Sequence, residues 1–420
     1  MTAESAEQQR VLQLHAKKLE PDWMRDLRLA ALNQYAGLPD PAPKRQAAPG
    51  RPAGFFHADK APAPCPDLSE PETLFLKNGR NRLCYANGRI VVHHLEAKLA
   101  KAGVLLVDLS LAIRVYPQLV RPYLATLIPP SEHKWAAWQT AVWNAGLFLY
   151  VPKNIRLKVP LQAWWNRTKA GGTLHPRVLV VAEENSDVTL LTGDVSQLEE
   201  AAFSVSITEV FAKAGARVRL ASIGEHDAAM TRRTFARARV ERDARVEWLL
   251  VEGSQGEHSA DIKSLLSGAG ASTQLDVVAL SHASQRLDLT LTAHHIAPHT
   301  ASIIRERAVV TGQAHSGTRV ISQIEQGAVG TNAIQEARMI LLEPSARAEA
   351  LPMLLIDEED VRCDHAVSVG KLPAEPLFYL MSRGLSEREA KRLLLTGFLS
   401  PLAPDMSELL ELWVERKVAP

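Results

Sequence analysis

The sequence predicts a mainly β protein with a core of stacked coils and helical regions at both ends of the chain. Short segments of alternating apolar and polar residues, such as 217–220 and 286–291, dominate the region 145–366. A turn of small or polar residues followed by a strand recurs there about every 27 to 30 residues, which is typical of a β-solenoid with more than one strand per coil. Outside this region the apolar residues recur with helical spacing.

The repeated turn-and-strand segments indicate which residues should be equivalent in successive coils. These segments are residues 185–188, 215–218, 243–246, 270–273 and 300–303. We expect Val188, Val218 and Val246 to occupy the same inward position in three neighbouring coils. Two packed antiparallel sheets would also alternate apolar and polar residues, so a β-sandwich stays open as the alternative architecture.

Residues 1–38 are predicted to form an N-terminal helical region. Two groups of apolar residues have the spacing of a helix face, and Pro21 between them can begin a second helix. The groups are Val11 and Leu14, then Trp23, Leu27 and Ala31. Residues 39–71 are rich in proline and predict an extended linker, in which Cys65 is expected to be a dispensable exposed thiol.

Residues 72–144 form a mixed α/β segment, which precedes the stacked β core at 145–366. Within it, the amphipathic run 95–113 predicts one or two helices. Cys84 stands between two apolar or aromatic neighbours in this segment and is expected to be an inert core thiol.

Residues 367–420 are predicted to form a C-terminal helical domain. A short helix over 375–384 would end at Gly384, and Ser386 and Glu389 have the spacing of a capping box that begins the next helix. A last helix is expected over about 407–417. The apolar faces of these helices could pack against the end of the solenoid or bind a partner, and both alternatives stay open.

Composition and charge exclude several classes of function. A chain of 420 residues with 46% hydrophobic residues can bury a large core, and its net charge of +1 leaves no basic excess for nucleic acid. The first ten residues are polar and acidic, and no apolar run approaches the roughly 20 residues that span a bilayer. We therefore expect a cytoplasmic protein that binds neither membrane nor nucleic acid, with its three cysteines reduced.

Cys363 and His365 are the leading candidates for metal ligands. In a strand, residues two apart leave the same face roughly 6.6 Å from one another, so a thiolate and an imidazole could converge on one metal centre while Asp364 points away. Two donors are too few for an iron–sulfur or zinc site, which usually needs about four. The others would come from a distant coil or from another chain. The alternative is a buried thiol beside an ordinary histidine.

A histidine cluster is the second candidate for a metal site. It consists of His282, His294, His295 and His299. Adjacent His294 and His295 would point to opposite faces of a strand, and Pro298 indicates that the strand ends there. We therefore interpret these histidines as making turn and stacking contacts.

The motifs of common enzymes are missing from the sequence. It contains no Gly-x-x-x-x-Gly-Lys-Ser/Thr loop, so ATP hydrolysis, if required, would come from a partner. It also contains no His-Glu-x-x-His, Cys-x-x-Cys or Gly-x-Ser-x-Gly motif. We expect that the chain is not an enzyme by itself.

The C-terminal third contains a series of segments whose residues and order are distinctive: residues 331–343, 346–356, 359–365, 369–372, 377–380 and 382–384. Taken in this order, they closely resemble the SufB/SufD family of iron–sulfur cluster assembly proteins. Residues 20–29 resemble the family's N-terminal helix, and residues 148–154 resemble its entry into the β core. The pattern Asp-Val-x-Cys-x-His, present here with Cys363 and His365, is typical of the SufD side of the family.

This resemblance implies a right-handed parallel β-helix flanked by helical regions. It also implies that the chain pairs with SufB through the β-helix core and binds the ATPase SufC through its C-terminal helices. Cys363 and His365 would then hold part of a transient iron–sulfur cluster shared with SufB, with no cofactor tightly bound in the isolated chain. Two copies could pair when SufB is absent. The alternatives are a SufB-like cluster scaffold and a β-solenoid enzyme acting on carbohydrate.

Overall fold

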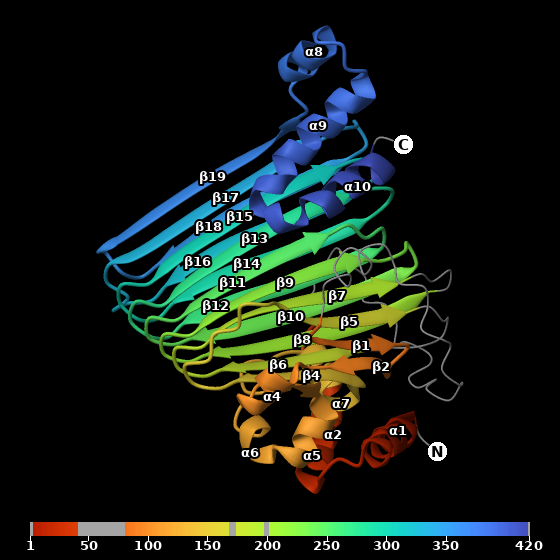
Figure 1. The fold of residues 1–420 in the computed structure, drawn as a ribbon, viewed down its shortest axis with the longest axis vertical. Coiled ribbons are helices and arrows are strands. Elements are labelled where there is room, and N and C mark those ends of the chain that lie inside the picture. The colour runs from red at the N-terminus through yellow and green to blue at the C-terminus, as the bar shows by residue number, and fades with distance from the viewer. Residues whose placement is uncertain (1–2, 41–79, 168–173, 197–200, 419–420) are drawn as a thin grey trace.

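The computed structural model describes residues 3–40, 80–167, 174–196 and 201–418. The chain is mainly β, with 46% strand and 25% helix, and it forms a parallel β-solenoid of about 7 turns with helices at both ends (Figure 1). Residues 41–71 of the predicted linker, Cys65 included, lie outside the described residues.

Two sheets form the solenoid, and successive strands of the core alternate between them. Sheet A contains β1 (Arg82–Ala86), β2 (Arg89–His94), β5 (Leu161–Arg167), β7 (Asp187–Ser196), β9 (Arg217–Glu225), β11 (Arg245–Glu252), β13 (Ser272–Ser281), β15 (Ala301–Val310), β17 (Thr331–Leu341) and β19 (Val361–Lys371). Sheet B contains β3 (Leu105–Asp108), β4 (Ala145–Val151), β6 (Pro176–Ala182), β8 (Ala202–Ala212), β10 (Met230–Val240), β12 (Glu257–Leu266), β14 (Arg286–His295), β16 (His315–Ile324) and β18 (Arg347–Ile356). From β4 onward neighbouring strands pair in parallel, which excludes the antiparallel sandwich.

The register confirms the predicted inward positions of the first coils. Val188 pairs with Val218 and Val218 with Val246, and all three are buried in the core between the two sheets. The predicted alignment of residues 300–303 with residues 270–273 of the preceding coil is wrong by one residue. Thr273 pairs with Ser302, so Ile303 points outward, because the turn before β15 is one residue shorter than the sequence pattern suggested.

Each coil turns through one residue in the left-handed backbone region. These residues stack in a column: Asn185, Gly215, Asp243, Gly270, His299 and Gly330. The column alternates between glycine and a residue with a side chain, because the side chain covers the glycine of the next coil. A Cβ atom on Gly270, for example, would lie only 2.5 Å from Oδ1 of Asp243.

Helices cover the outer face of sheet B near the N-terminus. They are α1 (Ala3–Lys18), α2 (Asp22–Tyr35), α5 (Leu109–Val115), α6 (Pro117–Val120) and α7 (Lys134–Val142). The short helix α4 (Ala97–Lys101) instead places Leu99 against the core between the two sheets. Pro21 occupies the N-cap of α2, in agreement with its predicted role. A fully buried ion pair between Arg28 and Glu20 (2.7 Å) fixes α2, and Arg28 also donates to the carbonyl oxygen of Ala141 in α7 at 2.9 Å. The run 95–113 forms two short helices, with strand β3 between them.

The C-terminal helices follow β19, which continues to Lys371 beyond the expected core boundary at residue 366. They are α8 (Ala374–Ser382), α9 (Glu387–Leu399) and α10 (Ser407–Lys417), with the 3₁₀ turns η1 (Ser400–Leu402) and η2 (Pro404–Met406) before α10. Gly384 has a φ of 96°, and Ser386 and Glu389 form the predicted capping box. The end of α9 and all of α10 lie along the outer face of sheet A rather than over the end of the solenoid (Figure 1).

Candidate functional site

Cys363 and His365 lie on the inner face of β19, the last strand of sheet A. Cys363 pairs in register with Ala333, and His365 with Gln335, both of which are buried between the sheets. The two side chains therefore share one face at the open end of the solenoid. Asp364 lies on the outer face, where Arg362 Nε contacts its carboxylate at 3.2 Å, as the strand alternation predicted.

The two candidate ligands differ in their surroundings. Cys363 is a half-buried free thiol that packs beside Ala333 and Ile324, and burial together with the neighbouring Asp364 raises its pKa above the ordinary value. His365 is exposed. In the described part of the chain no group of three or more His, Cys, Asp or Glu residues could hold a metal ion. Among the described residues, Cys363 and His365 by themselves would supply only two of the roughly four ligands that an iron–sulfur cluster needs.

The structure separates the histidines of the second candidate. His295 is buried, and its ring nitrogens lie 2.8 Å and 2.9 Å from the hydroxyls of Thr300 and Ser302, with burial lowering its pKa to about 4. His294 faces outward and contacts Glu325 at 2.6 Å. His299 belongs to the left-handed turn column and covers Gly330. These three side chains make turn and packing contacts, as interpreted from the sequence.

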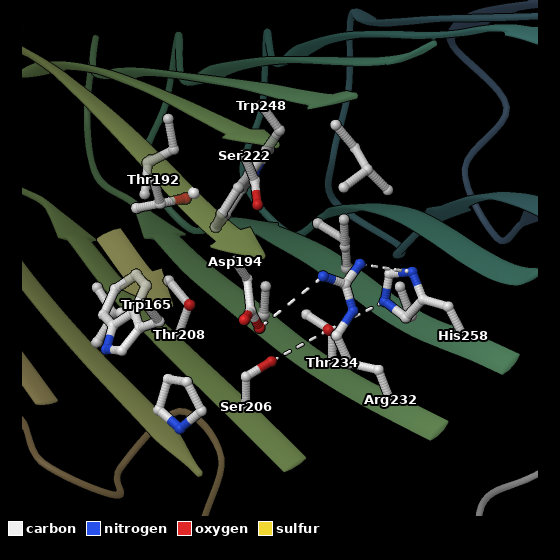
Figure 2. A pocket seen from close by; sticks show the side chains of 18 of the residues that line it. Trp165, Thr192, Asp194, Ser206, Thr208, Ser222, Arg232, Thr234, Trp248 and His258 are labelled. Atoms are coloured by element: carbon white, nitrogen blue, oxygen red, sulfur yellow. Dashed lines mark hydrogen bonds and ion pairs between the residues drawn. The ribbon is translucent and has the colours of Figure 1, made fainter. Parts of the chain in front are cut away.

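Sequence reasoning missed a cavity inside the solenoid, with a volume of about 80 Å³, whose mainly apolar lining includes a cluster of polar side chains (Figure 2). Strands of both sheets line it, and Arg232 lies between Asp194 and His258 in its wall. Arg232 forms an ion pair with the buried carboxylate of Glu252 and lies 2.8 Å from Nδ1 of His258. Asp194 is in turn paired with Arg167. The polar groups in this wall therefore neutralise one another within the chain.

Burial and the charge of Arg232 shift the pKa values of Glu252 and His258 in this internal network. Although burial opposes it, the positive charge of Arg232 and the bond to His258 hold the pKa of Glu252 well below its ordinary value. Burial and the charge of Arg232 lower the pKa of His258 below its ordinary value, although Glu252 acts in the opposite direction. The sequence shows these charged residues within the strands, but it does not show that they point inward. Their inward position follows from the pairing register of the coils.

An apolar layer separates this cavity from the open end of the solenoid. Leu250, Val277 and Leu289 belong to the core between the two sheets. Beyond them lies Glu306, whose carboxyl oxygen Oε1 accepts from Thr318 at 2.9 Å. The cavity and the Cys363–His365 pair are thus two distinct places in the fold.

Cys84, in the segment predicted to be mixed α/β, lies on β1 and therefore in sheet A, the same sheet as Cys363. It is buried on the outer face, in the cluster that contains Trp164 and Leu191. Since β1 and β19 lie toward opposite ends of the sheet, the two thiols cannot contact each other.

Comparison with known proteins gives two family matches. Residues 165–398 match the family described as "SUF system FeS cluster assembly, SufBD core domain", and residues 80–163 match "SufBD protein N-terminal region". The chain belongs to the SufBD family. The core match begins in β5 and ends in α9, so this SufBD core includes the solenoid coils that carry Cys363 and His365.

Individual relatives agree with this assignment. The iron–sulfur cluster assembly protein SufD of Bacillus subtilis (strain 168) is 32% identical over 418 residues, covering 96% of this chain and 94% of that protein. A SufBD family protein of Staphylococcus epidermidis (strain ATCC 12228) is 26% identical over 423 residues, covering 94% of this chain and 88% of that protein. The resemblance to a family of iron–sulfur cluster assembly proteins is confirmed. Among the described helices, none is long and apolar enough to cross a membrane.

Proposed function

We propose that the chain acts in the cytoplasm as a SufD-like subunit of a complex with SufB and the ATPase SufC. It would serve cluster assembly as a binding subunit rather than as an enzyme. The observation that carries this proposal is the position of Cys363 and His365 on the inner face of a strand that ends its sheet. Two donors placed there can meet the donors of a second chain.

The end of the solenoid offers a surface for a SufB-like partner. β18 and β19 end the two sheets, so their outer edges carry main-chain donors and acceptors that a partner's strands can bind. Large apolar side chains are exposed on the same two strands: Leu351, Leu355, Ile356, Val367 and Val369. A long exposed edge with apolar side chains favours pairing with another sheet. A second copy of the chain could occupy this edge when SufB is absent.

The donors at this edge suit a shared iron–sulfur cluster as the transient cargo. A cysteine thiolate and an imidazole are both ligands of iron, and each needs its partners in place to bind tightly. We expect the isolated chain to bind iron poorly and the assembled complex to bind it well.

The C-terminal helices offer a separate surface for the ATPase. In α8 no residue is buried, and Phe378 is 73% and Tyr379 56% exposed. Leu393 on α9 is 56% exposed. Aromatic and aliphatic side chains exposed this strongly on neighbouring helices are typical of a protein interface.

The proposal can be tested in the assembled complex. A complex with SufB and SufC that carries Cys363→Ser and His365→Ala should remain intact but hold several-fold less iron and sulfide after anaerobic reconstitution. Because Cys84 is a buried thiol at the other end of sheet A, Cys84→Ala is the matched control and should leave the cluster content unchanged. Wild-type iron and sulfide in the double variant would show that the pair does not ligate the cluster.

A further inference from the structure

We infer that Gln335 is a positioning residue for His365: its side-chain carbonyl oxygen accepts a hydrogen bond from the imidazole and so directs the other ring nitrogen toward the metal. This inference rests on the proposed ligand role of His365. It concerns a side chain that the sequence did not single out, on the strand next to the candidate pair.

The amide of Gln335 is fixed in one orientation by sheet B. Nε2 donates to Oγ of Ser322 at 2.8 Å and to the carbonyl oxygen of Met353 at 3.1 Å. Because a backbone carbonyl can only accept, the amide nitrogen must face Met353 and the oxygen must point elsewhere. That oxygen, Oε1, is buried and has no hydrogen-bond partner within the described residues. Because the residue is only 2% exposed, solvent does not readily reach it.

The fold leaves few neighbours that could donate to this oxygen. On the inner face of sheet A, Gln335 pairs with Ile304 on one side and with His365 on the other. Its own strand neighbours on that face are Ala333 and Ala337. These three have apolar side chains. His365 is the in-register neighbour that carries an N–H group, and paired parallel strands lie roughly 4.8 Å apart.

The consequence for a metal site follows from the chemistry of imidazole. When one ring nitrogen donates to an acceptor, the other keeps its lone pair and a fixed direction, which is how metal-bound histidines are usually held. His365 is exposed in the isolated chain, so its ring can turn. When a partner covers the edge at β19, the ring would lie over Gln335 and satisfy the buried oxygen. Loss of such a supporting bond typically lowers metal affinity about 10- to 100-fold.

A double-mutant cycle in the complex with SufB and SufC tests this inference, with Co²⁺ as the probe. The variants are Gln335→Leu, His365→Ala and the two combined, and Gln285→Leu is the matched control because Gln285 is also fully buried. The readouts are the Co²⁺ affinity, the near-ultraviolet charge-transfer band of cobalt–thiolate bonds and the visible d–d bands, which report the coordination geometry of the cobalt. We expect Gln335→Leu to weaken binding about 10-fold or more and to shift the cobalt spectrum, while the control binds as the wild type does.

The combined variant decides whether Gln335 acts through His365. If it does, the combined variant binds Co²⁺ no more weakly than His365→Ala alone. Independent losses that multiply in the combined variant would overturn the inference, as would wild-type affinity in Gln335→Leu. If His365→Ala itself bound Co²⁺ normally, His365 would not be a ligand. That result would overturn the proposed function together with this inference.

Discussion

At the scale of single residues, the inner face of the solenoid places ionisable groups where water cannot reach them. Glu306 on β15 is the clearest case, since it is almost fully buried and one of its two carboxyl oxygens has no hydrogen-bond partner in the part of the chain that the structure describes. Burial raises the pKa of its carboxyl group to about 7, although the hydrogen bond from Thr318 acts in the opposite direction. Near neutral pH this side chain therefore exists partly as the neutral acid.

Glu306 should make the stability of the protein depend on pH. In the unfolded chain the carboxyl group loses its proton near its ordinary pKa of about 4.5, whereas the folded chain keeps it up to about 7. Stability is therefore lost as pH rises from about 4.5 to 7, by up to about 3 kcal/mol. Glu306→Gln should be more stable than the wild type at pH 8, and this advantage should shrink toward pH 5.

Denaturant unfolding at several pH values measures this effect as the difference between variant and wild type. Glu411 lies exposed on α10, so Glu411→Gln is the control and should give a difference that does not change with pH. A pH-independent difference for Glu306→Gln would contradict the prediction.

At the scale of elements, the turns determine how closely the coils can stack. The N–H of Asp243 donates to the carbonyl oxygen of Ala269 in the next coil at 3.0 Å. The N–H of Gly270 likewise donates to the carbonyl oxygen of Pro298, one coil further on, at 3.2 Å. Such contacts need a left-handed residue at every turn and alternating small and large side chains. Coil spacing and residue choice are therefore coupled along the whole column.

Gly270→Ala should destabilise the protein more than the same change at Gly327. Both glycines have positive φ, so an alanine is strained at either position, but only at Gly270 does the new Cβ atom meet another group. Among the described residues, no atom lies within 4 Å of a Cβ placed on Gly327. We expect a loss of about 1 kcal/mol at Gly327 and at least about 1 kcal/mol more at Gly270, measured by denaturant unfolding. Equal losses would show that crowding by Asp243 is relieved without cost.

At the scale of the whole molecule, the C-terminal helices divide into a part that packs on the solenoid and a part that is exposed. Leu399, Leu410 and Trp413 pack on the outer face of sheet A, against residues such as Leu249 and Val278. No residue of α8 is buried. Removing every residue after Leu372 would therefore uncover a large apolar face of the core. Point changes on α8 and α9 are the better test of partner binding.

Phe378→Asp combined with Leu393→Asp should abolish binding to SufC while leaving the solenoid intact. Both side chains are more than half exposed, so charges there cost little folding energy but disrupt an apolar interface. Val115→Asp is the matched control, because Val115 is also about half exposed but lies on α5, far from α8 and α9 in the sequence. Co-purification with tagged SufC measures binding, and the midpoint of thermal unfolding measures folding. Retained binding in the double variant would assign SufC to another surface.

The sequence by itself determined the features that depend on near neighbours. The coil period, the start of α2 at Pro21, and the capping box of Ser386 and Glu389 were all predicted, because turns and caps are set by residues within a few positions of one another. The shared face of Cys363 and His365 was predicted for the same reason, since alternation along one strand is a local property.

Only the tertiary structure decided which residues meet across coils. Gln335 beside His365, Arg232 beside Glu252, and Cys84 within sheet A all depend on strand register between residues that are far apart in sequence. A coil one residue shorter than the sequence pattern suggested is enough to exchange the predicted faces of Ser302 and Ile303. Turn length and hydrogen bonding between coils set that register, and the residues of one strand do not encode it.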